Sequence, residues 1–252
     1  MLTVVFFLVI IAVAPIAQAQ LTSVKISEIR IDQPSSDEDE YFELVGTANQ
    51  DLTGLTYLVI GDGTGGSGVI EAVIDLSGQS IPSSTYFVAA ESTFSLGTAN
   101  YTTTLNFENS DNVTHLIVTG FTGSDGQDLD TDDDCTLDTT PWTSVVDSVS
   151  LIETAGSGDC YYGNKEIGPS GSYVPAHVWQ CTEGWNIGKY DPDEGDDTVG
   201  AAATSCPDSN AVSFSQMKAN QGKTLKDTGF LLLIFSVVFI GGYWLRRHQV
   251  HE

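Results

Sequence analysis

Residues 128–138 (DLDTDDDCTLD) form the part of the sequence whose residue types and spacing most clearly suggest chemistry. Six of these eleven residues are aspartates, and four of them follow the pattern D-x-D-x-D-x-x-x-D. Alternating carboxylates let successive oxygens converge on one hard cation as the loop wraps around it. The pattern therefore predicts a Ca²⁺ site with the ligands Asp128, Asp130, Asp132, Asp134 and Asp138.

Two positions distinguish this loop from an EF-hand. Counted from Asp130, the twelfth residue is Pro141 where an EF-hand has glutamate, and the sixth is Cys135 where it has glycine. A cysteine in the left-handed bend that glycine normally supplies costs roughly 1–2 kcal/mol. The loop is more similar to the short aspartate loops of thrombospondin type 3 and dockerin-like repeats. An exposed acidic turn without a bound ion is the alternative interpretation.

The chain contains four cysteines, and an even number of cysteines in an exported protein favours disulfides over free thiols. Three pairings are possible and the sequence alone does not choose among them, although pairing of nearest neighbours is the simplest. Each nearest-neighbour bridge closes a loop worth about 3 kcal/mol in the chain-entropy model. The candidates for disulfide bonding are Cys135, Cys160, Cys181 and Cys206.

Residues that could carry catalysis are sparse. Residues 20–207 contain only two histidines, His115 and His177, and neither a G-x-S-x-G nor an H-E-x-x-H motif occurs. The segment 61–66 (GDGTGG) matches G-x-G-x-x-G, but the residues after it predict a strand, so it indicates a hairpin loop and no nucleotide site. We expect no enzymatic activity. Because acidic pairs are abundant, an exported hydrolase or an accessory subunit of a surface enzyme is the alternative.

Two N-x-T sequons are present, at Asn100 and at Asn112. In a eukaryotic secretory pathway both can carry glycans. We then expect both asparagines to be exposed.

The elements that position these residues are short β-strands. The sequence shows β-branched and aromatic runs separated by Gly, Asp, Asn, Ser and Pro, which predicts an all-β, antiparallel sandwich. The alternation slips at Glu28, which predicts a β-bulge, and Phe42 is expected to face away from Tyr41 and Glu43. The expected strands are 24–31, 40–46, 55–61, 69–75, 85–91, 102–107, 114–121, 143–153 and 173–179.

Three strand motifs at the start of this region resemble the opening of a lamin tail domain. They are I-x-E-I at 26–29, E-aromatic-x-E-L at 40–44 and L-x-G-L at 52–55, and the segment 185–203 is similar to the close of such domains. The resemblance frames most of residues 21–204 and implies an immunoglobulin-like sandwich with insertions in its middle. The family recurs in exported and surface proteins, sometimes beside nuclease domains, and no nuclease domain fits in this chain.

The two ends of the chain predict export and membrane attachment. Residues 1–19 have the apolar core and small-x-small end of a signal peptide. Residues 228–245 form an apolar run followed by two arginines, which predicts a transmembrane helix. We expect a β-sandwich at 20–207, a polar stalk at 208–227 and a cytoplasmic tail at 246–252.

The predicted ectodomain is strongly acidic. It contains 31 of the 34 acidic residues and 4 of the 9 basic residues, a formal charge of −27. Such a surface repels nucleic acids and attracts divalent cations. The sequence predicts a single-pass cell-membrane protein with its amino-terminal domain outside, which presents a calcium-stabilised module for adhesion or recognition of an extracellular protein or glycan.

Overall fold

The computed structural model describes residues 23–203 except 64, 155–158 and 183. Their regular secondary structure consists of β-strands and one short 3₁₀ helix, η1 (Pro192–Glu194). The strands are β1 (Lys25–Arg30), β2 (Tyr41–Val45), β3 (Leu55–Gly61), β4 (Val69–Asp75), β5 (Tyr86–Ala90), β6 (Tyr101–Thr102), β7 (Val113–Thr119), β8 (Ser144–Leu151), β9 (Glu166–Ile167), β10 (His177–Cys181) and β11 (Gly184–Ile187).

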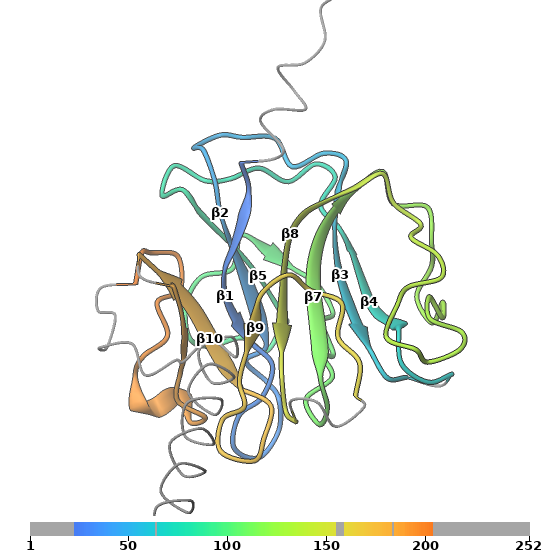
Figure 1. The fold of residues 1–252 in the computed structure, drawn as a ribbon. Helices are drawn as coiled ribbons and strands as arrows, with labels where there is room; N and C mark the ends of the chain where they lie inside the picture. The colour runs from blue at the N-terminus through green and yellow to red at the C-terminus, as the bar shows by residue number, and fades with distance from the viewer. Residues whose placement is uncertain (1–22, 64, 155–158, 183, 204–252) are drawn as a thin grey trace, which may run out of the picture. The chain divides into compact units, whose positions relative to one another are not determined.

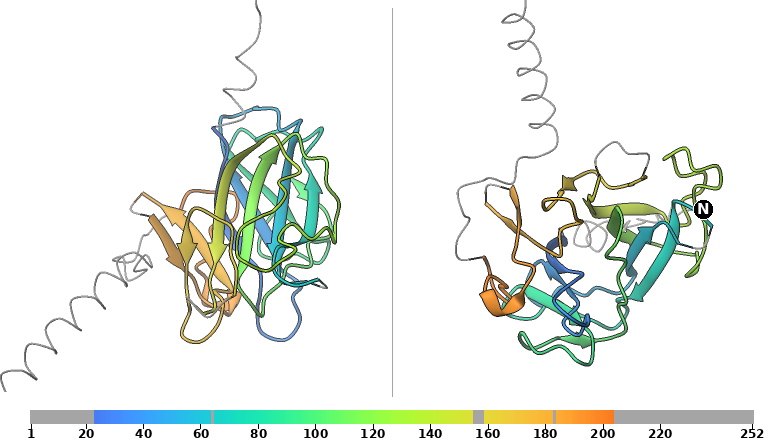
Figure 2. Two further views of the ribbon diagram at one scale, coloured as in Figure 1. Left: turned by 45° about the vertical axis from the view of Figure 1, so that its right-hand side comes forward. Right: turned by 90° about the horizontal axis from the view of Figure 1, so that it is seen from below.

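The strands form two sheets that pack face to face (Figures 1 and 2). Sheet A has the order β11-β10-β1-β2-β5-β6, and sheet C has the order β4-β3-β7-β8-β9. One apolar cluster joins the two inner faces, and within it the rings of Phe42 from β2 and Tyr57 from β3 stack at 3.7 Å between centroids. The predicted all-β, two-layer architecture is confirmed.

The sheets are mixed, whereas the sequence predicted purely antiparallel ones. β6 runs parallel to β5, and β9 runs parallel to β8. A parallel partner requires a crossover of about a dozen residues, and the connections 91–100 and 152–165 supply it. These long connections carry no strand signal, which is why the prediction missed the parallel pairs.

The β-bulge predicted in the first strand is confirmed. The register between β1 and β2 shifts between Ile26 and Glu28. Side chains three residues apart normally lie on opposite faces of a strand, but the extra residue lets both Ile26 and Ile29 enter the core. Glu28 is thereby turned to the outer face of sheet A.

The predicted strand bounds are right for β3 and β4, differ by one or two residues for β1, β2, β5, β7 and β8, and are wrong in two places. The short strands β9 and β11 were not predicted. Of the expected strand 102–107, only Thr102 belongs to β6, and Asn106 has a positive φ of 50°. The amide of Phe107 donates to the Glu40 carboxylate instead of to a neighbouring strand. The expected strand 173–179 begins only at His177, because Pro175 has no amide proton to contribute to a ladder.

The predicted signal peptide, the stalk, the transmembrane helix and the cytoplasmic tail lie outside the described residues. Within the part of the chain that the structure describes, no helix has the length and apolar character that crossing a membrane requires.

Candidate functional site

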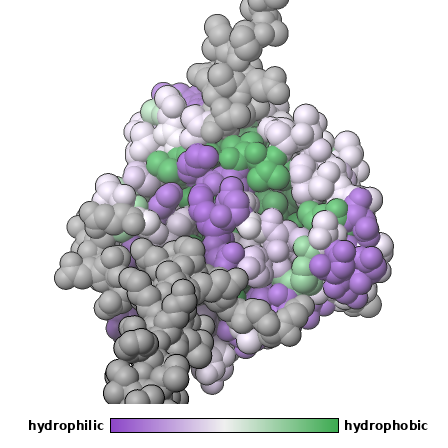
Figure 3. Space-filling view, viewed as in Figure 1, coloured by the Kyte–Doolittle hydropathy of each residue, from purple (hydrophilic) through white to green (hydrophobic). Residues whose placement is uncertain are grey.

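The aspartate loop, residues 120–143, connects β7 to β8 and covers the outer face of sheet C (Figure 1). Leu58, Ile60 and Leu116 form an apolar patch on that face, and the fully buried Leu129 packs into it from the loop. The amide of Leu129 also donates to the Gly68 carbonyl in the β3–β4 hairpin at 3.1 Å. The apolar contact therefore fixes the loop just before its acidic residues begin. In Figure 3 hydrophilic side chains gather on the right, over this part of the molecule.

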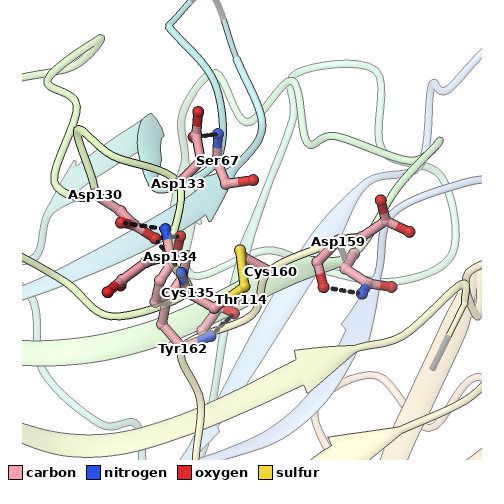
Figure 4. Close-up of a disulfide and its surroundings, with 10 residues drawn as sticks. Ser67, Thr114, Asp130, Asp133, Asp134, Cys135, Asp159, Cys160 and Tyr162 are labelled. Carbon is pink, nitrogen blue, oxygen red and sulfur yellow. Dashed lines mark hydrogen bonds between the residues drawn. A yellow bond between two sulfur atoms is a disulfide. The ribbon is translucent and has the colours of Figure 1, made fainter. Parts of the chain in front are cut away.

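A disulfide between Cys135 and Cys160 ties the loop to the segment after β8 (Figure 4). This is the nearest-neighbour pairing. Cys135 has a φ of 67°, so it occupies the left-handed bend that glycine fills in EF-hand loops. The disulfide and the bend therefore coincide at one residue. None of the described cysteines is a free thiol, and Cys206 lies outside the described residues, so the pairing of Cys181 with Cys206 stays a prediction.

Asp130 is the hub of the loop (Figure 4). Its buried carboxylate accepts hydrogen bonds from the amides of Asp134 at 3.2 Å and Cys135 at 2.9 Å. It also accepts one from the Tyr162 hydroxyl at 2.7 Å. Tyr162 comes from the segment that also contains Cys160, so the hydroxyl and the disulfide hold the loop from the same side. A carboxylate has about four lone-pair directions, which leaves about one for a further partner.

Two more predicted ligands lie beside this hub. Carboxylate oxygens of Asp130, Asp132 and Asp138 lie within 4.8 Å of one another. Asp138 accepts from the amide and the hydroxyl of Thr131, and these bonds lower the pKa of its carboxyl. Repulsion from Asp134, followed by burial and the charges of Asp138 and Asp130, raises the pKa of the exposed Asp132. Three carboxylate oxygens that converge in this way are chemically suited to a divalent cation.

The other two predicted ligands have different roles in this structure. Asp128 accepts the amide of Asp130 at 3.0 Å, and Asp134 contributes its backbone amide to the hub. Asp133, which was not predicted, has a φ of 53° and accepts the Ser67 amide at 2.8 Å, which links the loop to the β3–β4 turn. Alternation in the sequence predicts five ligands, and the structure brings the carboxylates of three of them together, in a loop that contains two left-handed residues.

A second acidic cluster, formed by Asp62, Glu71 and Glu108, lies at the end of the β3–β4 hairpin. Burial, together with neighbouring carboxylates, raises the pKa of Asp62 to about 6 and that of Glu71 to about 7. Oε2 of Glu71 is buried without a hydrogen-bond partner among the described residues. The sequence does not reveal this cluster, because its members come from three separate segments. The predicted hairpin loop at 61–66 is confirmed, since β3 and β4 pair on either side of it.

A buried polar network joins β1, β2 and β10, on the outer face of sheet A, to the closing segment, residues 189–200. The Arg30 guanidinium donates to both carboxylate oxygens of Asp197, at 2.9 and 2.7 Å. It also donates to the carbonyls of Lys189 and Tyr190. Arg30 is fully buried, and the closing segment supplies acceptors for its charged group.

Glu28 and Glu43 hold the far end of the closing segment. Glu28 accepts from the amide and the hydroxyl of Thr198, and from the Tyr41 hydroxyl at 2.6 Å. Glu43 accepts from the Gly200 amide at 2.7 Å. Both glutamates are buried. Thus Glu28 of the I-x-E-I motif and Glu43 of the E-aromatic-x-E-L motif bind the segment that closes the domain.

His177 completes this network. Its Nε2 lies 2.8 Å from Glu28, and its Nδ1 lies 3.2 Å from Asp196. Burial lowers the pKa of His177, but the hydrogen bonds to Asp196 and Glu28 and the charge of Asp197 outweigh burial, so the pKa is raised above its ordinary value. Glu28, His177 and Asp197 also place ligand atoms within 4.8 Å. Because Arg30 already neutralises Asp197, we interpret this group as a structural contact rather than a metal site.

The second histidine lies inside the sandwich. His115 is fully buried on β7, and its Nδ1 lies 2.9 Å from the Tyr57 hydroxyl. Burial lowers the pKa of His115 to about 3, so the ring is neutral at physiological pH.

The two sequons have opposite environments. Asn100 is exposed, as expected, whereas Asn112 is only 2% exposed. The expected exposure of Asn112 is therefore wrong, because its side chain bridges two segments of backbone: Nδ2 donates to the Asp159 carbonyl, and Oδ1 accepts the Glu153 amide.

Comparison of the chain with protein-family models, with curated proteins and with solved structures found no match.

Proposed function

We propose that this protein is a single-pass cell-surface protein whose extracellular β-sandwich is a calcium-stabilised module for adhesion or recognition of a protein or glycan. The observation that carries the proposal is the aspartate loop, in which a disulfide braces three converging carboxylates. Disulfides persist in oxidising compartments, which supports export. Extracellular calcium is abundant, so a site of modest affinity is sufficient.

Calcium has a physical role in this loop. Asp132 and Asp138 are held near Asp130 by the fold, and their mutual repulsion opposes that arrangement. A bound Ca²⁺ would replace the repulsion by attraction, with carbonyl and water oxygens filling the remaining coordination positions. The loop would then be a rigid acidic surface suited to recognition.

The proposal extends to the fold family. We infer an immunoglobulin-like sandwich of the lamin tail type, anchored in the membrane by residues 228–245. Support for the family comes from the motif residues themselves, because Glu28 and Glu43 at the start of the domain contact Thr198 and Gly200 at its close. The resemblance to lamin tail domains lies at the two ends of the domain. Those ends contact each other, so their residues are constrained together.

A melting experiment on the purified full-length protein tests the calcium proposal. Saturation at about 100 times Kd adds about 2.7 kcal/mol, a melting-temperature rise of roughly 5–10 °C for a chain of this size. Asp132→Asn should abolish most of this rise. Glu38→Gln, which removes one exposed charge from the loop before β2, is the matched control and should retain it. Identical melting curves in calcium and in excess chelator would refute the proposal.

A further inference from the structure

Asn100 has the geometry of a glycan acceptor. It is exposed and precedes β6 in the sequence Asn100-Tyr101-Thr102. Its Oδ1 accepts the Val88 amide at 2.8 Å, and its own amide donates to the Val88 carbonyl at 2.8 Å. These two bonds fix the side chain by its oxygen. Nδ2 of Asn100 donates no hydrogen bond to any described residue, so the nitrogen to which a glycan is attached is available.

Asn112 has the opposite geometry although its sequon is equally good. Its Nδ2 donates to the Asp159 carbonyl at 3.0 Å, and its Oδ1 accepts the amides of Glu153 and Thr154. Its sequon threonine, Thr114, is fully buried and hydrogen-bonded to Ser150. A glycan on Asn112 would replace one of the two hydrogens of this buried Nδ2 and place a bulky polar group inside the fold.

We propose that Asn100 is the N-glycosylation site of this protein and that Asn112 is left unmodified. The donor is a lipid-linked diphospho-oligosaccharide of a eukaryotic secretory compartment. A bond forms between Nδ2 of Asn100 and the anomeric carbon of the first sugar. The bond from that carbon to the phosphate breaks, the lipid diphosphate leaves with the bonding electrons, and Nδ2 gives up one proton. This proposal rests on the export included in the proposed function.

The position of the glycan follows from the sheet order. β6 is the last strand of sheet A, and its outer side has no strand partner among the described residues. Open sheet edges are templates for unwanted pairing with another chain. A glycan on the residue that precedes β6 stands at this edge and shields it.

The test is expression of the full chain in a eukaryotic secretory cell, followed by site mapping with mass spectrometry after enzymatic deglycosylation. Thr102→Ala destroys the sequon without altering the bonds between Asn100 and Val88, because Thr102 is exposed and pairs with Ala90 through its backbone. Thr102→Ser is the matched control, since it keeps the sequon. The expected result is modification at Asn100 in the wild type and in Thr102→Ser, its loss in Thr102→Ala, and no modification at Asn112.

A second variant separates a failure of this proposal from a failure of export. Gly78→Asn creates a sequon with Gln79 and Ser80 in an exposed turn, where Gly78 has a φ of 79° and open space around a Cβ. Asparagine tolerates that backbone better than most residues. Modification at position 78 with none at Asn100, or modification at Asn112, would overturn the site assignment. No modification at either 78 or 100 would overturn the export on which both proposals depend.

Discussion

Arg30 is the residue on which the closing segment depends most directly. Its guanidinium and the carboxylate of Asp197 are both buried, at 0% and 7% side-chain exposure, and they form a pair with two hydrogen bonds. Removing one partner of such a pair leaves an uncompensated buried charge. The closing segment also donates to Glu28 and Glu43, so its loss would expose two more buried carboxylates.

Arg30→Ala is therefore expected to lower the free energy of unfolding by about 3–5 kcal/mol. The matched control is Lys189→Ala, because Lys189 and Glu194 form an exposed pair in the same segment. An exposed pair contributes little to stability, because water screens its charges. Chemical denaturation followed by intrinsic fluorescence measures both values. Equal effects of the two variants would show that the closing segment is not held by its buried charges.

The aspartate loop shows at the scale of an element how an apolar anchor and a covalent bond position acidic residues. Leu129 is buried against sheet C just before Asp130, and Cys135 is tied to Cys160 five residues later. The intervening carboxylates therefore have little freedom to separate. The fold therefore holds these carboxylates together even though their like charges favour separation, which is the preorganisation that the proposed calcium site requires.

Replacing Cys135 and Cys160 together by serine tests this preorganisation. The disulfide closes a loop with a sequence separation of 25 residues, and its loss should destabilise the protein by about 3 kcal/mol. The calcium-dependent rise in melting temperature should also shrink, because Asp130 would lose the fixed amide of residue 135. Titration with Ca²⁺ by calorimetry measures the change in affinity. An unchanged affinity would place the ion elsewhere.

The strands and the aspartate loop could be predicted from the sequence because their signals are local. β3 and β4 are rich in β-branched and other apolar residues and end at glycine or aspartate, and their bounds were predicted correctly. The pairing of Cys135 with Cys160 joins nearest neighbours, which is the simplest of the possible pairings. The alternation of aspartates identified Asp130, Asp132 and Asp138, although not the side-chain direction of Asp134.

The network under the closing segment could not be predicted because its partners are distant in the chain. Glu28 lies 149 residues from His177 and 170 residues from Thr198. No periodicity or spacing connects positions so far apart. Within the acidic run at 191–197, the sequence gives no sign that Asp197 pairs with a buried arginine.

At the scale of the whole molecule, the dominant property is an excess of acidic groups, several of which are buried. Burial, the largest cause, raises the pKa of Glu40 and of Glu43 to about 8, and that of Glu71 to about 7. Each carboxyl binds its proton more tightly in the folded state than in the unfolded state. The stability that this contributes is complete below the unfolded pKa of 4.5 and is lost as the pH rises through the folded value.

The protein is therefore expected to become more stable as the pH is lowered from about 8.5 to about 5 in the presence of chelator. His177 acts in the same direction, since its raised pKa also means that protonation favours the folded state. Asp138 and Asp196 act in the opposite direction, because their pKa values are lowered in the folded state. The stability that they contribute is present above the ordinary aspartate pKa of 3.8 and is lost only as the pH falls through the lowered values. Melting temperatures measured across this range test the prediction. A maximum at alkaline pH would contradict it.

The closing segment also determines how the sandwich would respond to mechanical load. In a protein anchored through residues 228–245, tension from the membrane enters the domain at its carboxy-terminal end. The Gly200–Glu43 and Thr198–Glu28 contacts would be loaded first, and the Arg30–Asp197 pair next. Pulling would therefore detach the closing segment from sheet A before it separated the core strands. The buried ion pair would then determine the force that the domain withstands when the proposed extracellular partner is pulled away.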